Sequence, residues 1–126
     1  MSTKEILLVD DDIDDLEIFI EAIESLDKNV KCRTSLSPKL ALEELIQADN
    51  LPDLILLDYN MPQINGLEFL KRLQSDTRLA AIEVIIVSTP EEEVMVPWLN
   101  KNGVNVKYIS KPSDFAELKT VLNDIL

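Results

Sequence analysis

The chain has 126 residues, 46% of them hydrophobic, which suits one compact domain with a single core. Its 24 acidic and 12 basic residues give a formal net charge of −12, which disfavours binding to nucleic acids and anionic membranes. The absence of histidine excludes histidine-dependent catalysis and most zinc sites. The single cysteine, Cys32, cannot form an internal disulfide, and no apolar run is long enough to span a membrane. We expect a cytoplasmic protein whose chemistry uses carboxylates, hydroxyls and lysines.

Short apolar runs alternate with longer amphipathic segments along the chain, as in folds built from βαβ units. Residues 6–9, 54–57 and 84–87 have no polar interruption, which predicts central parallel strands covered on both faces. Residues 30–34 and 106–109 include charged side chains and are predicted to form edge strands. The expected fold is an α/β sandwich with a doubly wound, five-stranded parallel sheet.

Apolar residues at helical spacing predict four helices between or after these strands, at 13–26, 38–46, 67–73 and 115–125. Another helix should lie between residues 90 and 102. Pro97 removes a backbone donor there and clashes one turn back, so this helix should kink or start near Pro97 and be short or mobile. Its apolar cluster is interpreted as core packing: Val94, Met95, Val96, Trp98 and Leu99.

Polar side chains directly follow four of the predicted strands. They are Asp10 to Asp12 after the first, Asp58 after the third, Ser88 and Thr89 after the fourth, and Ser110 and Lys111 after the fifth. The carboxyl ends of parallel strands meet at one edge of a sheet, and ligands bind in the crevice there. Each residue alone is also an ordinary strand-end residue. Gathered at one edge, they form a set suited to phosphoryl chemistry.

Several carboxylates in one crevice repel one another, and a divalent cation between them removes this repulsion. Oxygen ligands favour Mg²⁺ over zinc, so Mg²⁺ is the predicted cofactor. A carboxylate beside the cation can attack phosphorus and form an acyl phosphate, while a lysine and a hydroxyl stabilise the phosphoryl oxygens. Asp58, Lys111 and Ser88 match these three roles.

Four motifs, in this order, resemble those of the response-regulator receiver family, the CheY-like domains of two-component signalling. They are Leu8-Val9-Asp10-Asp11, Leu57-Asp58-Tyr59-Asn60-Met61-Pro62 followed by Asn65-Gly66-Leu67, Val87-Ser88-Thr89, and Ser110-Lys111-Pro112. Each motif alone is weak, but the four together are specific. The resemblance implies one receiver domain over residues 1–126, with the flavodoxin-like strand order 2-1-3-4-5.

The resemblance also implies roles in the acidic cluster. Asp58 would accept the phosphoryl group and would also be a ligand of Mg²⁺. Asp11 would bind Mg²⁺ directly, Asp10 through a water molecule, and Asn60 through its backbone carbonyl. The other acidic residues nearby are interpreted as helix N-terminal charges that suit the helix dipole: Asp12, Asp14 and Asp15.

A switch is implied at the other strand ends. Ser88 would be the hydroxyl that closes onto the phosphoryl group, with Thr89 as the alternative, and Lys111 would pair with that group. Tyr108 resembles the aromatic residue that changes orientation with phosphorylation. The peptide bond to Pro112 is often cis in the family.

Pro90 departs from the family pattern. It lies two residues after Ser88, where the family often has a residue that influences hydrolysis of the aspartyl phosphate. Proline cannot orient a water molecule with a polar side chain, so we predict slow autodephosphorylation.

The implied upstream partner is a histidine kinase or a phosphotransfer protein. Because the receiver fills the chain, the signal should pass to a partner protein through the surface of the fourth helix, fifth strand and fifth helix. One interpretation of Trp98 and Tyr108 is that both are core aromatics; of the two, Tyr108 on an edge strand is expected to face a partner more readily.

Two other functions are considered. The strand followed by Asp-x-Asp at Asp10 resembles haloacid-dehalogenase-type phosphatases, in which Asp10 would be the nucleophile. That family usually has a longer chain and a later acidic pair, where this sequence has Ser88 and Thr89. The third possibility is a degenerate receiver that acts only as a binding module.

Overall fold

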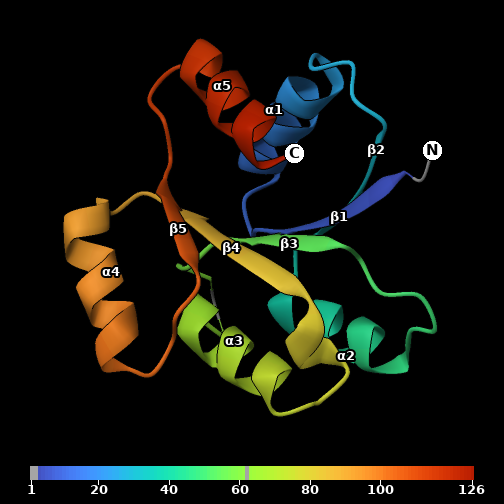
Figure 1. The fold of residues 1–126 in the computed structure, drawn as a ribbon, viewed down its shortest axis with the longest axis vertical. Helices are drawn as coiled ribbons and strands as arrows, with labels where there is room; N and C mark the ends of the chain where they lie inside the picture. The colour runs from blue at the N-terminus through green and yellow to red at the C-terminus, as the bar shows by residue number, and fades with distance from the viewer. Residues whose placement is uncertain (1–2, 62) are drawn as a thin grey trace.

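The structure is a computed structural model that describes residues 3–61 and 63–126. Pro62, from the motif with Asp58, lies outside the described residues. The described strands are β1 (Lys4–Val9), β2 (Val30–Ser35), β3 (Leu54–Leu57), β4 (Glu83–Ser88) and β5 (Lys107–Ser110). They form one sheet in the order β2-β1-β3-β4-β5, and all neighbouring pairs are parallel (Figure 1). This order confirms the predicted doubly wound, flavodoxin-like fold.

The described helices cover both faces of the sheet. They are α1 (Ile13–Glu24), α2 (Pro38–Gln47), α3 (Gly66–Gln74), α4 (Glu92–Lys101) and α5 (Phe115–Ile125), with a short 3-10 helix, η1 (Leu79–Ala81), before β4. Figure 1 shows α1 and α5 on one face and α2 and α3 on the other, with α4 beside β5. Within the described ranges, no helix is both long enough and apolar enough to cross a membrane.

The central strands are buried as predicted. All of β3 and residues 6–9 of β1 are buried, because helices cover both faces of these strands. Alternate residues of the strands pack into two separate hydrophobic cores, one under α1 and α5 and the other under α2, α3 and α4. The carboxyl ends of β1 and β3 lie side by side, because the two strands pair in parallel with Val9 opposite Leu57.

Local sequence explains where three of the helices begin. The side chains of Asp12, Ser37 and Asn65 each accept a hydrogen bond from a backbone N–H in the first turn of α1, α2 and α3. Pro38, the first residue of α2, needs no hydrogen-bond partner at that position. The observed start of α2 agrees with the predicted helix over residues 38–46.

Helix α4 contradicts one of the two predicted outcomes at Pro97, a start near that residue, whereas the predicted kink stays a prediction. It does not start near Pro97 but runs for ten residues through it, and the helix has no side-chain hydrogen bond at its N-cap, Glu91. Its apolar cluster is only partly core: Met95 and Leu99 are buried, but 64% of Val94 and 45% of Trp98 is exposed, with Val96 also exposed. The interpretation of the whole cluster as core packing is therefore wrong for three of its five members.

Candidate functional site

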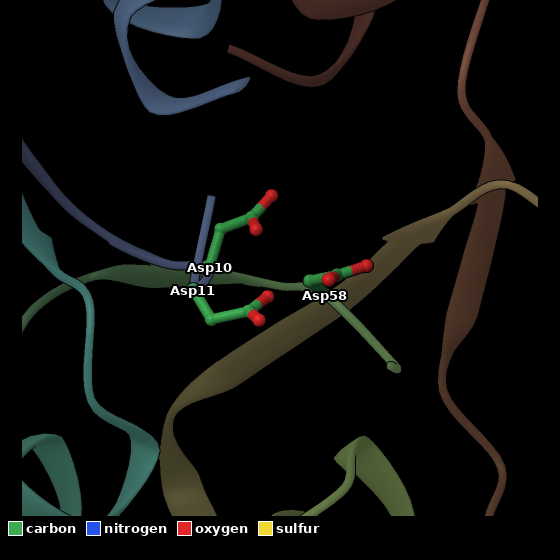
Figure 2. A group of neighbouring side chains, drawn as sticks. All are labelled: Asp10, Asp11 and Asp58. Atoms are coloured by element: carbon green, nitrogen blue, oxygen red, sulfur yellow. The ribbon is translucent and has the colours of Figure 1, made fainter. Parts of the chain in front are cut away.

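Three aspartates meet at the carboxyl edge of the sheet (Figure 2). Asp10 and Asp11 directly follow β1, and Asp58 follows β3. The two strands are neighbours, and the backbone N–H of Asp58 donates to the carbonyl of Val9 at 2.9 Å. As a result, one carboxylate oxygen from each aspartate lies within 4.8 Å of the others. The predicted acidic cluster is therefore present.

The cluster is partly withdrawn from water. Asp10 and Asp58 are only 7% and 8% exposed, whereas Asp11 is exposed. The pKa of Asp58 is raised to about 6, mainly by burial and also by the nearby charges of Asp10 and Asp11, against the opposing effects of Lys111 and the Ser88 hydrogen bond. Burial also raises the pKa of Asp10. Two buried carboxylates beside a third are unfavourable as bare anions, so this donor set fits a divalent cation bound by oxygen.

Asn60 lies two residues after Asp58 in an exposed loop position. Its assignment as a backbone-carbonyl ligand of Mg²⁺ stays a prediction, as do the direct contact from Asp11 and the water-mediated contact from Asp10.

Lys111 brings a positive charge into the cluster. Its Nζ atom lies 3.3 Å from Asp10 Oδ2 and 3.6 Å from Asp58 Oδ1. The nearest carboxylate is that of Asp15 in the first turn of α1, at 2.8 Å. The sequence interpretation assigned Asp15 only a helix-terminal charge and missed this ion pair. Its place one turn beyond the acidic motif was the one available signal, because a residue there can face the strand ends.

Ser88 supplies a hydroxyl beside the same Asp58 oxygen that Lys111 approaches. Its Oγ donates to Asp58 Oδ1 at 3.1 Å, and the residue is 1% exposed. Thr89 is exposed, so the structure favours Ser88 over Thr89 as the hydroxyl that faces Asp58. The backbone N–H of Lys111 donates to the Ser88 carbonyl at 2.8 Å, which ties the ends of β4 and β5 together.

Tyr108 points inward instead of toward solvent. It is 4% exposed, and its hydroxyl donates to the carbonyls of Ser88, at 3.3 Å, and Pro90. Burial raises the pKa of Tyr108 to about 12, so the phenol stays protonated and remains a donor. The expectation that Tyr108 faces a partner more readily than Trp98 is wrong for this state. Although β5 is an edge strand, α4 covers the face of β5 that carries Tyr108.

A hydrogen bond also connects α4 to the loop that follows Asp58. The Trp98 indole N–H donates to the hydroxyl of Tyr59, the residue after Asp58, at 2.9 Å. Gly66 lets the chain pack closely here, since a Cβ atom at that position would lie 3.0 Å from Tyr59 Cα. No sequence signal pointed to this contact.

The peptide bond between Lys111 and Pro112 is trans, because the described chain contains no cis peptide bond. This differs from the cis form that the resemblance made a frequent possibility.

The comparisons with known proteins agree with this geometry. Residues 6–123 match the response regulator receiver domain, so the chain belongs to that family. It is 36% identical to PilH of Pseudomonas aeruginosa over 75 residues, which cover 60% of this chain and 61% of PilH. The chain thus spans less than two thirds of this relative.

Two solved structures resemble the whole fold. The phosphorylated cyanobacterial phytochrome response regulator RcpA has a TM-score of 0.84 and 30% identity, with 98% of this chain and 91% of RcpA covered. The Mn²⁺-bound form of response regulator Rcp1 has a TM-score of 0.80 and 27% identity, with 97% and 91% covered. Receivers of this family are signalling proteins and not dedicated enzymes, and phosphorylation on aspartate with Mg²⁺ is general among them. The family match favours a receiver over a haloacid-dehalogenase-type phosphatase.

Proposed function

We propose that this chain is a response regulator receiver that takes up a phosphoryl group on Asp58 and passes the signal to a partner protein. The observation that supports this most directly is the position of the Asp58 carboxylate. It lies between two further carboxylates, a lysine ammonium and a buried hydroxyl. These are the groups needed for a nucleophile, a cation site and the stabilisation of phosphoryl oxygens.

The chemistry follows from these neighbours. A carboxylate oxygen of Asp58 attacks phosphorus, the bond from phosphorus to the donor's leaving group breaks, and an acyl phosphate results. Lys111 and Ser88 then have a positive charge and an O–H to offer to the phosphoryl oxygens. Mg²⁺, held by Asp11, Asp58, the Asn60 carbonyl and Asp10 through water, would neutralise part of the phosphoryl charge.

We infer the partners from the same assignment. A histidine kinase or phosphotransfer protein would supply the phosphoryl group. When Ser88 turns toward the phosphoryl group, its hydrogen bond to Asp58 is lost, and the adjoining contact with Tyr108 is the path by which the surface of α4, β5 and α5 would change. A downstream protein would recognise this surface.

The test is incubation with acetyl phosphate and Mg²⁺, followed by mass spectrometry that locates the modified residue. We expect a Mg²⁺-dependent adduct on Asp58, which is absent with EDTA and in Asp58→Asn. Asn keeps the size of the side chain but lacks the nucleophilic oxygen, so the variant should fold. An adduct on Asp10 would support the phosphatase chemistry instead. No adduct at all would leave a receiver that acts as a binding module.

A further inference from the structure

Lys111 is held mainly by a residue outside the acidic cluster. Its Nζ donates hydrogen bonds to Asp15 Oδ2 at 2.8 Å and to Asp10 Oδ2 at 3.3 Å. Asp58 Oδ1 lies farther away, at 3.6 Å, and accepts its hydrogen bond from Ser88 instead. The lysine on which phosphoryl binding should depend is therefore bonded toward α1 in this state.

The environment of the ion pair makes it more than a loose surface contact. The Lys111 side chain is 19% exposed and that of Asp15 is 35% exposed. Burial lowers the pKa of Lys111, but its hydrogen bond with Asp15 and the charges of Asp58 and Asp10 outweigh burial and raise the pKa. Lys111 thus stays charged and must be shared among its carboxylates.

Phosphorylation would change how that one charge is shared. A phosphoryl group adds a charge of about −1.5 to −2 and three acceptor oxygens next to Lys111. Asp10 is part of the acidic cluster, which fits a cation. Asp15 is not part of that cluster. Asp15 is therefore the carboxylate that still competes with the phosphoryl group for Lys111.

We propose that Asp15 is a positioning residue that holds the Lys111 ammonium toward α1 until Asp58 is modified, when Lys111 exchanges Asp15 for a phosphoryl oxygen. No covalent bond changes in this exchange. The competition with Asp15 lowers the affinity of the resting site for a phosphoryl group. It also means that phosphorylation releases the first turn of α1 from the end of β5. The inference rests on the proposed function of Asp58.

The test uses beryllofluoride as the probe, since it mimics a phosphoryl group on an aspartate without covalent turnover. Its affinity is measured at saturating Mg²⁺ for the wild type and for Asp15→Asn. Because a partly exposed ion pair contributes at most about 1 kcal/mol, we expect Asp15→Asn to bind beryllofluoride about fivefold more tightly. Asp14→Asn is the matched control: it removes the same charge from the same turn, and Asp14 is not among the carboxylates paired with Lys111. Its affinity should stay within about twofold of wild type.

Two further measurements separate this role from a structural one. Mg²⁺ affinity without beryllofluoride should be unchanged or weaker in Asp15→Asn, because the freed Lys111 pairs more closely with Asp10 and Asp58. A variant that fails to fold would lose affinity for both beryllofluoride and Mg²⁺, and urea unfolding would identify this failure. In that case Asp15→Ala is tested as the second variant. In a Lys111→Met background, Asp15→Asn should have no effect on beryllofluoride binding.

The proposal is overturned if folded Asp15→Asn binds beryllofluoride no more tightly than wild type, or if its effect persists without Lys111. Failure of the wild type itself to bind beryllofluoride would instead contradict the proposed function of Asp58, and the role of Asp15 with it.

Discussion

Asp58 has two kinds of neighbours, and they differ in the forces that hold them. The ionic neighbours are Asp10, Asp11 and Lys111, with Asp15 behind Lys111. The hydroxyl neighbours are Ser88, Tyr108 and Tyr59, and the Tyr59 hydroxyl is bonded in turn to Trp98 of α4. The first group responds to charge, pH and cations, whereas the second is neutral and directional. Under the proposed function, charge changes at Asp58 would act on the first group, and the second would convert them into positions of side chains near α4.

The largest expected effect comes from the raised pKa of Asp58, which is due mainly to burial and in part to the charges of Asp10 and Asp11. The folded-state pKa of about 6 exceeds the ordinary value of 3.8. The folded state therefore binds this proton more tightly than the unfolded state, so ionised Asp58 destabilises the metal-free fold above about pH 6. This cost disappears as the pH falls toward about 4. Two pKa units correspond to about 3 kcal/mol, which water at the open edge reduces to about 2 kcal/mol.

We thus expect Asp58→Asn to raise the free energy of unfolding by about 2 kcal/mol near pH 7.5 in EDTA, and by almost nothing near pH 4. Urea unfolding at both pH values measures this. The exposed Asp49 provides the control, because Asp49→Asn removes the same charge and should change stability by less than about 0.5 kcal/mol. A stabilisation of Asp58→Asn that is equal at both pH values would contradict the raised pKa.

A smaller effect is expected at Pro90, beside the hydroxyl neighbours. The quantity affected is the lifetime of the aspartyl phosphate. The wild-type aspartyl phosphate should decay slowly, because proline has no polar side chain to orient a water molecule. Pro90→Asn should shorten its half-life by about tenfold, a change of about 1.4 kcal/mol in the barrier. Pro90→Ala removes the ring without adding a polar group and should decay like wild type. The decay is followed by intact-mass spectrometry after donor removal; a wild-type half-life of only seconds would refute the prediction.

The smallest effect is expected at the contact between Tyr59 and α4. Tyr59→Phe removes the acceptor of the Trp98 indole N–H but keeps the ring beside Gly66. Since Trp98 is partly exposed and water can replace the acceptor, the variant should lose only about 0.5 kcal/mol of stability. Hydrogen exchange should become faster in α4 but not in the well-capped α2 of the same sample. If hydrogen exchange in α4 is equally fast in the wild type and in Tyr59→Phe, the contact does not stabilise this helix.

The acidic cluster was predictable from the sequence, and the contacts beyond it were not. Asp10 and Asp58 end uninterrupted apolar runs, so a parallel sheet must bring them to one edge. The ion pair of Asp15 with Lys111 depends on the orientation of two long-range side chains, which no periodicity encodes. Helix α4 continues through Pro97 because tertiary packing of Met95 and Leu99 offsets the backbone hydrogen bond lost at Pro97.

Trp98 is the single tryptophan of the chain, and its indole N–H is bonded to the residue that follows Asp58. Indole fluorescence depends on the polarity and hydrogen bonding around that N–H. The protein thus contains an intrinsic optical reporter at the junction of α4 and the Asp58 loop. Under the proposed function, steady-state emission would follow cation binding and phosphoryl uptake at this site in real time, without a label or a partner protein.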